Sequence, residues 1–137
     1  MQEIKKRRIL LASVLKPVDD PRMLEKIGGS LKQKYEVHIA GQPGNKEGHA
    51  SIIFHALPPF SRLSLARLFA PLRILKEAIA LKPELLILCT HELLSITLLA
   101  KMLLRCKVVY DVQENYWQNI YYGKAFPVYL RPLIAPF

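Results

Sequence analysis

The side chains best suited to chemistry lie between Lys107 and Trp117. This stretch begins with Val108 to Val112, a β-branched run typical of a strand buried on both faces, and then changes abruptly to acidic, amide and aromatic residues. In open parallel sheets, ligands bind outside the carboxyl ends of the strands. The first functional candidates are therefore Asp111, Gln113, Glu114 and Asn115. A turn that leads into a helix N-cap has the same residue pattern, and the pattern alone does not separate the two interpretations.

The composition is that of one globular domain with a positive surface. A chain of 137 residues can bury roughly two thirds of its unfolded surface. Since 51% of the residues are hydrophobic and 23% are charged, the sequence excludes intrinsic disorder. Lys and Arg total 20 against 11 Asp and Glu, which gives a formal charge of +9. This charge favours acidic partners, and it does not choose among nucleic acid, anionic lipid and phosphorylated small molecules.

The cysteines and the apolar runs indicate the cellular compartment in which the protein is expected. Cys89 and Cys106 lie in apolar surroundings without a C-x-x-C pattern, so we expect reduced core thiols in a cytoplasmic protein rather than a disulfide. Residues 5–15 superficially resemble a signal peptide, but the apolar part is short and no small-residue cleavage site follows. His91 and Glu92 interrupt the most hydrophobic segment, so no apolar stretch reaches the roughly 18 residues that span a bilayer.

The hydrophobic pattern predicts an α/β domain. Strands are expected at residues 8–14, 35–40, 50–56, 84–89 and 108–112, and helices at residues 22–34, 61–82 and 91–104. The order β-α-β-β-α-β-α-β folds into an open, mostly parallel, Rossmann-like sheet with helices on both faces. Strand order 3-2-1-4-5 would place the switch point between the first and fourth strands. Residues 16–20, 90–92 and 111–115 would then line one edge.

Several local features refine this expectation. Asp20 can cap the first helix, Ser61 the second and Thr90 the third. Prolines at 17 and 21 predict a loop over residues 15–21. Gly28 and Gly29 fall inside the first helix and not in a G-x-G-x-x-G motif, so they favour close packing of helix on sheet over contact with a ligand.

The second predicted helix is more hydrophobic than one buried face requires. One stripe along it consists of Leu65, Leu68, Leu72, Leu75 and Ile79, and a second patch consists of Leu63, Ala70, Ile74 and Leu81. Pro71 predicts a kink or the start of a new segment. The two apolar faces fit either a helix wedged between the sheet and a neighbouring helix or peripheral contact with a membrane.

The remaining polar residues do not form a metal site. His38, His49 and His55 are irregularly spaced and are interpreted as strand or loop histidines, and Cys89 with His91 is too sparse for zinc. Beyond Trp117 the sequence is rich in aromatic residues and ends on an apolar tail. We expect this end either to pack on something absent or to continue in a longer chain.

Three segments in order resemble the N-terminal domain of family-four glycosyltransferases of the GT-B fold. They are Asp19-Asp20-Pro21-Arg22, then Glu92-Leu93-Leu94, then the run from Val108 to Glu114. The corresponding family sequences are approximately D-D-x-R, P-E-L-L and V-V-Y-D-x-H-E. The resemblance covers nearly the whole chain.

The resemblance implies half of an enzyme. Family members are built from two Rossmann-like domains, of which the N-terminal one holds a saccharide or lipid-linked acceptor and the C-terminal one binds the nucleotide-sugar donor. Residues 1–137 correspond to the first domain, so the chain alone is expected to be inactive without a donor-binding domain or subunit. The nucleotide-sugar is a co-substrate, and the family chemistry needs neither a metal nor another cofactor.

The resemblance also implies site residues. The expected catalytic residues, facing the cleft between the domains, are Asp111, Gln113 and Glu114. The expected substrate-binding residues are Asp19, Asp20, Arg22, His91, Glu92, Asn115, Tyr116 and Trp117; the last two could stack on a sugar ring or belong to an interface core. The chain departs from the family at two positions. Gln113 replaces a histidine and can donate a hydrogen bond but cannot shuttle a proton, and His91 replaces a proline.

Two other classes of function fit parts of the sequence. A noncatalytic module would dock its basic surface on anionic lipid or on a partner that brings the donor-binding half, which agrees with a cytoplasmic protein peripheral to the inner face of the membrane. Nucleic-acid binding is disfavoured because the aromatic and basic residues do not interleave as they do on single-strand platforms.

Overall fold

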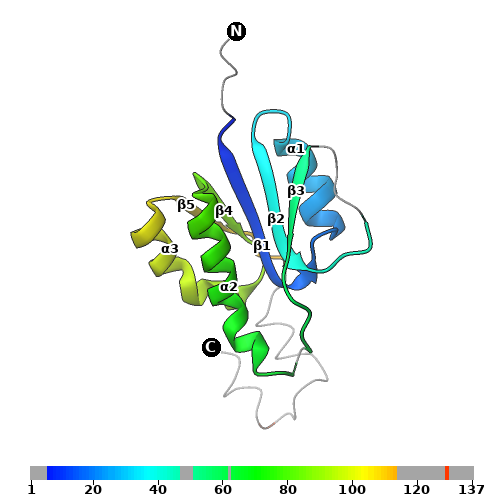
Figure 1. Cartoon of the computed structure of the whole chain (residues 1–137), viewed down its shortest axis with the longest axis vertical. Coiled ribbons are helices and arrows are strands. Elements are labelled where there is room, and N and C mark those ends of the chain that lie inside the picture. Colours follow the sequence, from blue (N-terminus) through cyan, green and yellow to red (C-terminus); the bar gives the residue numbers. More distant parts are fainter. Residues whose placement is uncertain (1–5, 47–50, 62, 114–128, 130–137) are drawn as a thin grey trace.

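Five parallel strands form the centre of the domain. The computed structural model describes residues 6–46, 51–61, 63–113 and 129. The strands are β1 (Arg8–Pro17), β2 (Glu36–Gln42), β3 (Ile52–Ala56), β4 (Leu85–Leu88) and β5 (Lys107–Tyr110). All neighbouring pairs are parallel and the spatial order is β3-β2-β1-β4-β5 (Figure 1). The predicted α/β class and strand order are thus confirmed, with a sheet that is parallel throughout.

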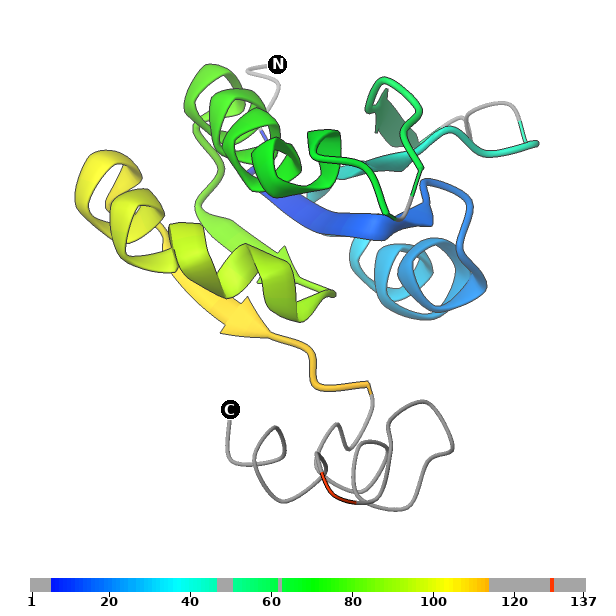
Figure 2. The ribbon, with the colours of Figure 1, turned by 90° about the horizontal axis from the view of Figure 1, so that it is seen from below.

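The helical segments cover both faces of the sheet. The segments in chain order are η1 (Arg22–Gly28, π-helical), α1 (Gly29–Leu31), α2 (Ala66–Leu81), η2 (His91–Ile96, 3-10) and α3 (Thr97–Leu104). Viewed from below, α2 and α3 lie on one side of the sheet and η1 with α1 on the other (Figure 2). This arrangement follows from right-handed crossovers between parallel strands.

Alternation along the strands divides the core into two parts. Leu10, Ala12 and Val14 of β1 pack towards α2, η2 and α3, whereas Ile9 and Leu11 pack towards η1. All of these side chains are buried. Because both faces of β1 are covered, the strand needs an unbroken apolar run, which is the pattern that identified it in the sequence.

The end of β1 differs from the expected loop over residues 15–21. The strand continues to Pro17, with a register shift relative to β2 between Ala12 and Pro17. Side chains compensate for the interrupted ladder, since Lys16 N donates to Ser13 Oγ over 2.9 Å and Gln42 Nε2 donates to Val14 O over 3.0 Å. The prolines thus exclude a helix, as predicted, but the irregular strand keeps the chain extended up to the edge of the sheet.

The predicted helices are shorter or less regular than expected. Ser61 does not cap the second helix: α2 begins at Ala66, and the Ser61 carbonyl instead accepts from Ser64 N in a preceding turn. The helix continues through Pro71 to Leu81 rather than beginning anew. The third predicted helix begins as η2, and its regular part, α3, begins only at Thr97.

The burial of α2 is the reverse of what its leucine stripe suggests. Leu65, Leu68 and Leu72 are exposed, whereas Ala70 and Ile74 are buried against the sheet. Of the stripe, Leu75 alone is buried, and Ile79 is again exposed. Small side chains on the other face allow α2 to approach the sheet closely, so the smaller apolar face is the inner one.

The two adjacent glycines differ in their surroundings. A Cβ atom on Gly28 would lie 2.9 Å from Met23 O and 3.2 Å from Ile52 Cδ1, whereas a Cβ on Gly29 would meet only Leu24 O, at an ordinary 3.6 Å. The prediction that glycine permits close packing of helix on sheet is confirmed for Gly28. Gly29 has no such role.

Both cysteines are buried and free, as predicted for reduced core thiols. Among the described residues, no helix has the length and the apolar character that crossing a membrane requires.

Candidate functional site at the carboxyl edge of the sheet

Two loops that are far apart in the sequence meet where β1 and β5 end. Asp111 directly follows β5 and extends its pairing, because Asp111 N donates to Leu88 O over 2.9 Å. Its carboxylate accepts two hydrogen bonds from Arg22, one from Nε over 2.8 Å and one from the terminal Nη2 over 2.6 Å. This bidentate, charge-assisted contact fixes both distance and orientation. The ion pair therefore joins the start of η1 to the end of β5.

Gln113 and Lys16 extend this contact into a network. Gln113 Nε2 donates to Asp111 Oδ2 over 2.9 Å, and Gln113 Oε1 accepts from Lys16 Nζ. The ammonium of Lys16 also lies 4.0 Å from Asp20 Oδ2. The network contains two cations, two carboxylates and one amide, all at the carboxyl edge of the sheet. We call these five residues, Lys16, Asp20, Arg22, Asp111 and Gln113, the edge network.

Asp20 positions the first residues of η1. Its Oδ1 accepts from Arg22 N and from Met23 N, each over 3.1 Å. These amides have no partner within the helix, so Asp20 satisfies them as predicted for a capping carboxylate. The cap holds the backbone of Arg22 in the orientation from which its guanidinium reaches Asp111.

The pKa shifts of Asp111 and of the nearby Cys89 indicate the protonation state of each side chain at neutral pH. The pKa of Asp111 is lowered, first by the hydrogen bonds from Arg22 and then by the one from Gln113, and burial only partly opposes this. Asp111 therefore stays ionised at neutral pH and is a weak base. Cys89, buried at the end of β4, has its pKa raised to about 12 by burial and by the charge of Asp111. Its thiol stays protonated and is not a nucleophile.

Thr90 lies at the same edge but does not cap the helix that follows it. Its side chain makes no capping bond to η2, and its Oγ1 instead accepts from Val14 N over 3.1 Å. The register shift in β1 leaves that amide in need of a partner, and the buried hydroxyl supplies one. The predicted cap is thus wrong, and Thr90 ties the end of β4 to β1.

His91 and Glu92 pair on the side of the sheet that α2 covers. Glu92 Oε1 accepts from the guanidinium of Arg67 on α2, and His91 Nδ1 lies 3.5 Å from Glu92 Oε2. Because Arg67 belongs to the α2 layer, this contact anchors η2 to α2. The carboxylate of Glu92 is thus directed to α2, while that of Asp111 is directed to η1.

Asp19 binds different backbone groups from its neighbour Asp20. Its Oδ2 accepts from Asn45 N over 2.9 Å and from Lys46 N over 3.1 Å, which fixes the loop after β2. The pKa of Asp19 is lowered, mainly by the hydrogen bond from Lys46 N. Asp19 therefore stabilises the loop that flanks the edge network without belonging to it.

The described parts of all three segments lie at the carboxyl edge of the sheet, as expected, but only the first and the last contribute side chains to the edge network. The structure brings Asp20 and Arg22 together with Asp111 and Gln113, and it places His91 and Glu92 beside α2. The other expected site residues, Glu114, Asn115, Tyr116 and Trp117, lie outside the described residues.

Lys16 was absent from the predicted site residues, although the predicted edge included its position. Nothing in the sequence around a lysine that follows an apolar run indicates that it takes part in a polar network. The partner that reveals it, Gln113, lies 97 residues further along the chain, and only the strand order brings the two segments together.

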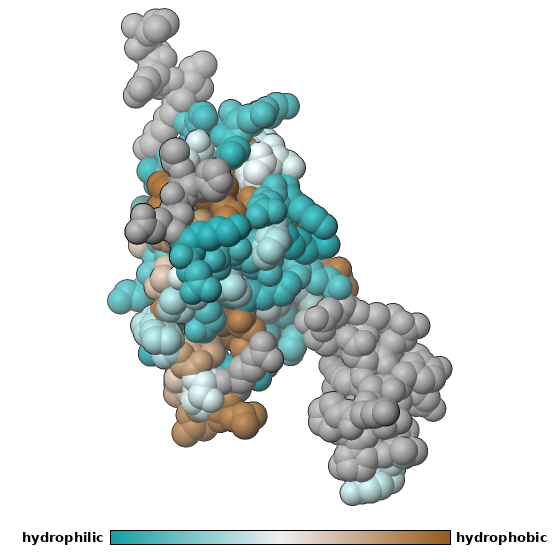
Figure 3. Space-filling view, turned by 90° about the vertical axis from the view of Figure 1, so that its right-hand side faces the viewer, coloured by the Kyte–Doolittle hydropathy of each residue, from teal (hydrophilic) through white to brown (hydrophobic). Residues whose placement is uncertain are grey.

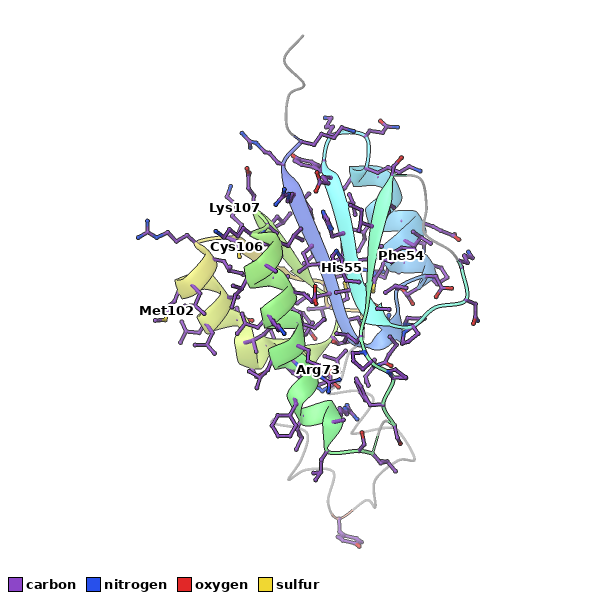
Figure 4. All side chains as sticks on the ribbon, viewed as in Figure 1. Phe54, His55, Arg73, Met102, Cys106 and Lys107 are labelled. Atoms are coloured by element: carbon purple, nitrogen blue, oxygen red, sulfur yellow. The ribbon has the colours of Figure 1, made fainter. Side chains whose placement is uncertain are left out.

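A second polar chain was also missed. His38 Nε2 lies 2.9 Å from Glu36 Oε1, His38 Nδ1 lies 2.9 Å from His55 Nε2, and His55 Nδ1 lies 3.3 Å from Glu77 Oε2 on α2. Each of these three contacts needs a proton on one of its two atoms to be a hydrogen bond. Two neutral histidines carry only one ring proton each, so all three hydrogen bonds can form only if the pair takes up a third proton. Burial and the neighbouring His38 lower the pKa of His55, which opposes uptake of the third proton. Figure 4 shows His55 on β3.

The edge network can bind and orient polar ligands. Arg22 is partly exposed, and Lys16 has further N–H donors, so both can donate to hydroxyl or phosphate oxygens. Within the described part of the chain, no group of three or more His, Cys, Asp or Glu side chains is arranged to hold a metal ion.

The chain was also compared with known proteins. No protein-family model, no curated protein and no solved structure matches it. Its function is therefore inferred from its own residues.

Proposed function

We propose that the chain is the acceptor-side domain of a glycosyltransferase, which binds a saccharide or the saccharide part of a lipid-linked acceptor. The observation that supports this proposal is the edge network, in which Asp20 and Arg22 of the first loop meet Asp111 and Gln113 after β5. It lies at the carboxyl ends of parallel strands, where open α/β sheets bind their ligands. The same residues carry the sequence resemblance to family-four glycosyltransferases.

The chemistry of sugar transfer assigns different roles to the residues at this edge of the sheet. In sugar transfer, an acceptor hydroxyl oxygen bonds to the anomeric carbon, the bond from that carbon to the diphosphate breaks, and the hydroxyl proton leaves. Asp111 is kept ionised by Arg22, and Gln113 can only form hydrogen bonds, so both orient groups and neither removes the proton. Lys16 and Arg22 donate to acceptor oxygens. Proton removal falls to Glu114, which the resemblance places at the cleft.

Saccharide binding tests this assignment with the chain as it is. Ligand-observed NMR would be recorded with neutral saccharides, phosphorylated saccharides and nucleotide-sugars. We expect saccharide signals that are lost in Arg22→Gln and in Lys16→Gln. Glu25→Gln is the matched control, because Glu25 pairs with Lys46 on the exposed side of η1 and does not touch the edge network. The control should bind like the unaltered chain.

Two outcomes would overturn the acceptor-side assignment. One is binding of nucleotide-sugars without binding of saccharides, since this is the property of the donor half. The other is saccharide binding that the Arg22 and Lys16 substitutions leave unchanged, which would place the ligand elsewhere.

A further inference from the structure

A large apolar surface lies on the outer side of α2 and α3. Its members are exposed leucine, phenylalanine and methionine side chains. We call the following set the leucine face: Leu65, Leu68, Phe69, Leu72, Leu98, Met102 and Leu103. Leu65, Leu68 and Met102 are 76%, 71% and 68% exposed. Figure 3, seen from the β3 side, shows hydrophobic surface at the lower end of the coloured part, at the level where α2 begins, and Figure 4 shows Met102 extending outward from α3.

Such a surface needs an explanation, because single exposed leucines are normal on soluble proteins whereas grouped ones mark interaction sites. The leucine face draws on two neighbouring helices that pack against each other and against the same side of the sheet. The inner face of α2 already fills the core with Ala70, Ile74 and Ala78. The outer leucines are therefore not needed for folding.

The charges around the leucine face are mainly positive, and the one acidic residue of α2, Glu77, is paired with His55. No Asp or Glu occurs between residues 48 and 76 or between residues 93 and 110. The basic residues in the described parts of these stretches are Arg67, Arg73, Lys76, Lys101, Arg105 and Lys107. On α2, Arg73 and Lys76 are exposed and follow the leucines within one turn. An apolar stripe flanked mainly by cations is typical of a helix that lies in a membrane interface.

Within the described ranges, ion pairing neutralises most of the acidic side chains but leaves cations near the leucine face unpaired. Among the described residues, seven acidic side chains have a Lys, Arg or His partner within 4.0 Å, as in the Arg22–Asp111 and Arg8–Glu36 pairs. By contrast, Arg73, Lys76 and Lys101 have no acidic partner in the described part of the chain. Over the residues that the structure describes, unpaired positive charge is therefore present beside the leucine face, as it also is at Lys26, Lys32 and Lys34 near η1 and α1.

An open groove between the two helices adds to this surface. It has a volume of about 360 Å³ and is lined by Ile79, Lys82, Leu103 and Leu104. An ammonium beside apolar walls suits an anionic headgroup above an acyl chain, because lysine can lay its methylenes along apolar surface while its charge stays in water.

From these observations we propose that the leucine face docks on an anionic lipid bilayer. The leucines enter the boundary between headgroups and acyl chains, while Arg73, Lys76 and Lys101 contact lipid phosphates. A second copy of the chain is a poorer occupant. A symmetric dimer through this face would bring the same unpaired cations together. The proposal rests on the α2 and α3 surface and does not require sugar transfer.

Vesicle flotation tests the proposal with the whole chain. Vesicles of pure phosphatidylcholine would be compared with vesicles that also contain phosphatidylglycerol. We expect the chain to float with the mixed vesicles and not with the pure ones, and added salt to weaken binding. Leu68→Ser and Met102→Ser should each weaken binding by about tenfold, because each removes one inserted apolar side chain. Arg73→Gln with Lys76→Gln should weaken it as well.

The matched control is Ile53→Ser on β3. Ile53 is exposed to a similar degree as Leu72 but belongs to the opposite edge strand, so this variant should bind vesicles like the unaltered chain. Circular dichroism would establish that each variant is folded, which is expected because the altered side chains are exposed.

Three results would overturn the bilayer proposal. They are absence of binding to mixed vesicles, binding that the leucine substitutions leave unchanged, and a soluble dimer that Leu68→Ser dissociates. Each is separate from the saccharide test, since the leucine substitutions lie outside the edge network and leave saccharide binding intact if both proposals hold.

Discussion

Alanine substitution at Gly28 and at Gly29 separates packing from helix propensity at two adjacent positions. Both residues have right-handed helical backbone angles, with φ of −60° at Gly28 and −57° at Gly29. Replacing glycine by alanine in a helix gains about 1 kcal/mol of stability, because the unfolded chain loses freedom. This gain is common to the two variants. A difference between them therefore measures the surroundings of the added methyl group.

The surroundings predict opposite results. At Gly29 the methyl group would make one ordinary contact at 3.6 Å, so Gly29→Ala should raise the free energy of unfolding by about 1 kcal/mol. At Gly28 it would lie 2.9 Å from Met23 O, which is backbone and cannot rotate away, and 3.2 Å from Ile52 Cδ1 on β3. Overpacking of this kind costs about 1–3 kcal/mol. Gly28→Ala should therefore be less stable than Gly29→Ala by about that amount.

Urea unfolding followed by far-UV circular dichroism measures the difference. The dependence on urea concentration should be the same for both variants, so that the shift in midpoint reports stability alone. Equal midpoints for Gly28→Ala and Gly29→Ala would refute the close approach of Gly28 to Met23 O within η1 and to Ile52 on β3. A higher midpoint for Gly28→Ala than for Gly29→Ala would refute it more strongly.

Three further predictions concern protonation and the edge network. The pKa of His55 is lowered in the folded chain, so as pH falls below 6.5 the unfolded chain takes up a proton at His55 before the folded chain does. The free energy of unfolding should therefore decrease as pH falls from 6.5 through the folded pKa. In urea unfolding at a series of pH values, His55→Gln should reduce this decrease in midpoint. For Asp111, whose pKa is lowered, the contribution of the ion pair with Arg22 is present above about pH 3.8 and is lost as pH falls through the folded value; Asp111→Asn should remove this loss in acid unfolding. In Gly41→Ala, the new Cβ would lie 2.6 Å from Lys16 O, so the segment that carries Lys16 must move; we expect a loss of about 1–3 kcal/mol in urea unfolding together with weaker saccharide signals in NMR.

The strands and their order could be predicted because each depends on a local pattern and a general rule. Continuous apolar runs such as Ile9 to Val14 indicate strands covered on both faces, and parallel crossovers have one hand. The order β3-β2-β1-β4-β5 is one of the common orders that these rules allow. The ends of the elements could not be predicted as well, because the continuation of β1 to Pro17 depends on a side-chain hydrogen bond from Gln42.

The inner face of α2 could not be predicted from periodicity. Two apolar faces compete, and the larger side chains of Leu65 and Leu68 would be the natural choice for the core. The sheet instead accepts Ala70 and Ala78, whose small side chains allow the helix to approach closely, together with Ile74 and Leu75. Hydrophobicity identifies which residues are apolar, while the choice between faces depends on the shape of the sheet beneath.

Long-range polar contacts could not be predicted from local sequence patterns either, because the two partners lie far apart in the chain. Thr90 has the sequence of a helix cap, yet its hydroxyl binds Val14 N, 76 residues earlier, because a register shift leaves that amide unpaired. Arg22 and Asp111 are separated by 89 residues. Their segments were both predicted to lie at one edge, but the pairing of these two side chains needs the geometry of the capped turn.

The ion pairs connect the two proposals through electrostatics. An anionic bilayer repels carboxylates, so a domain that docks on it must neutralise the acidic side chains near its surface or turn them away. In the edge network, Arg22 pairs with Asp111, and Lys16 lies beside Asp20. The network therefore has no large negative field of its own within the described residues. A saccharide site with balanced charges can work beside an anionic surface, whereas a site with unpaired carboxylates would be pushed away from it.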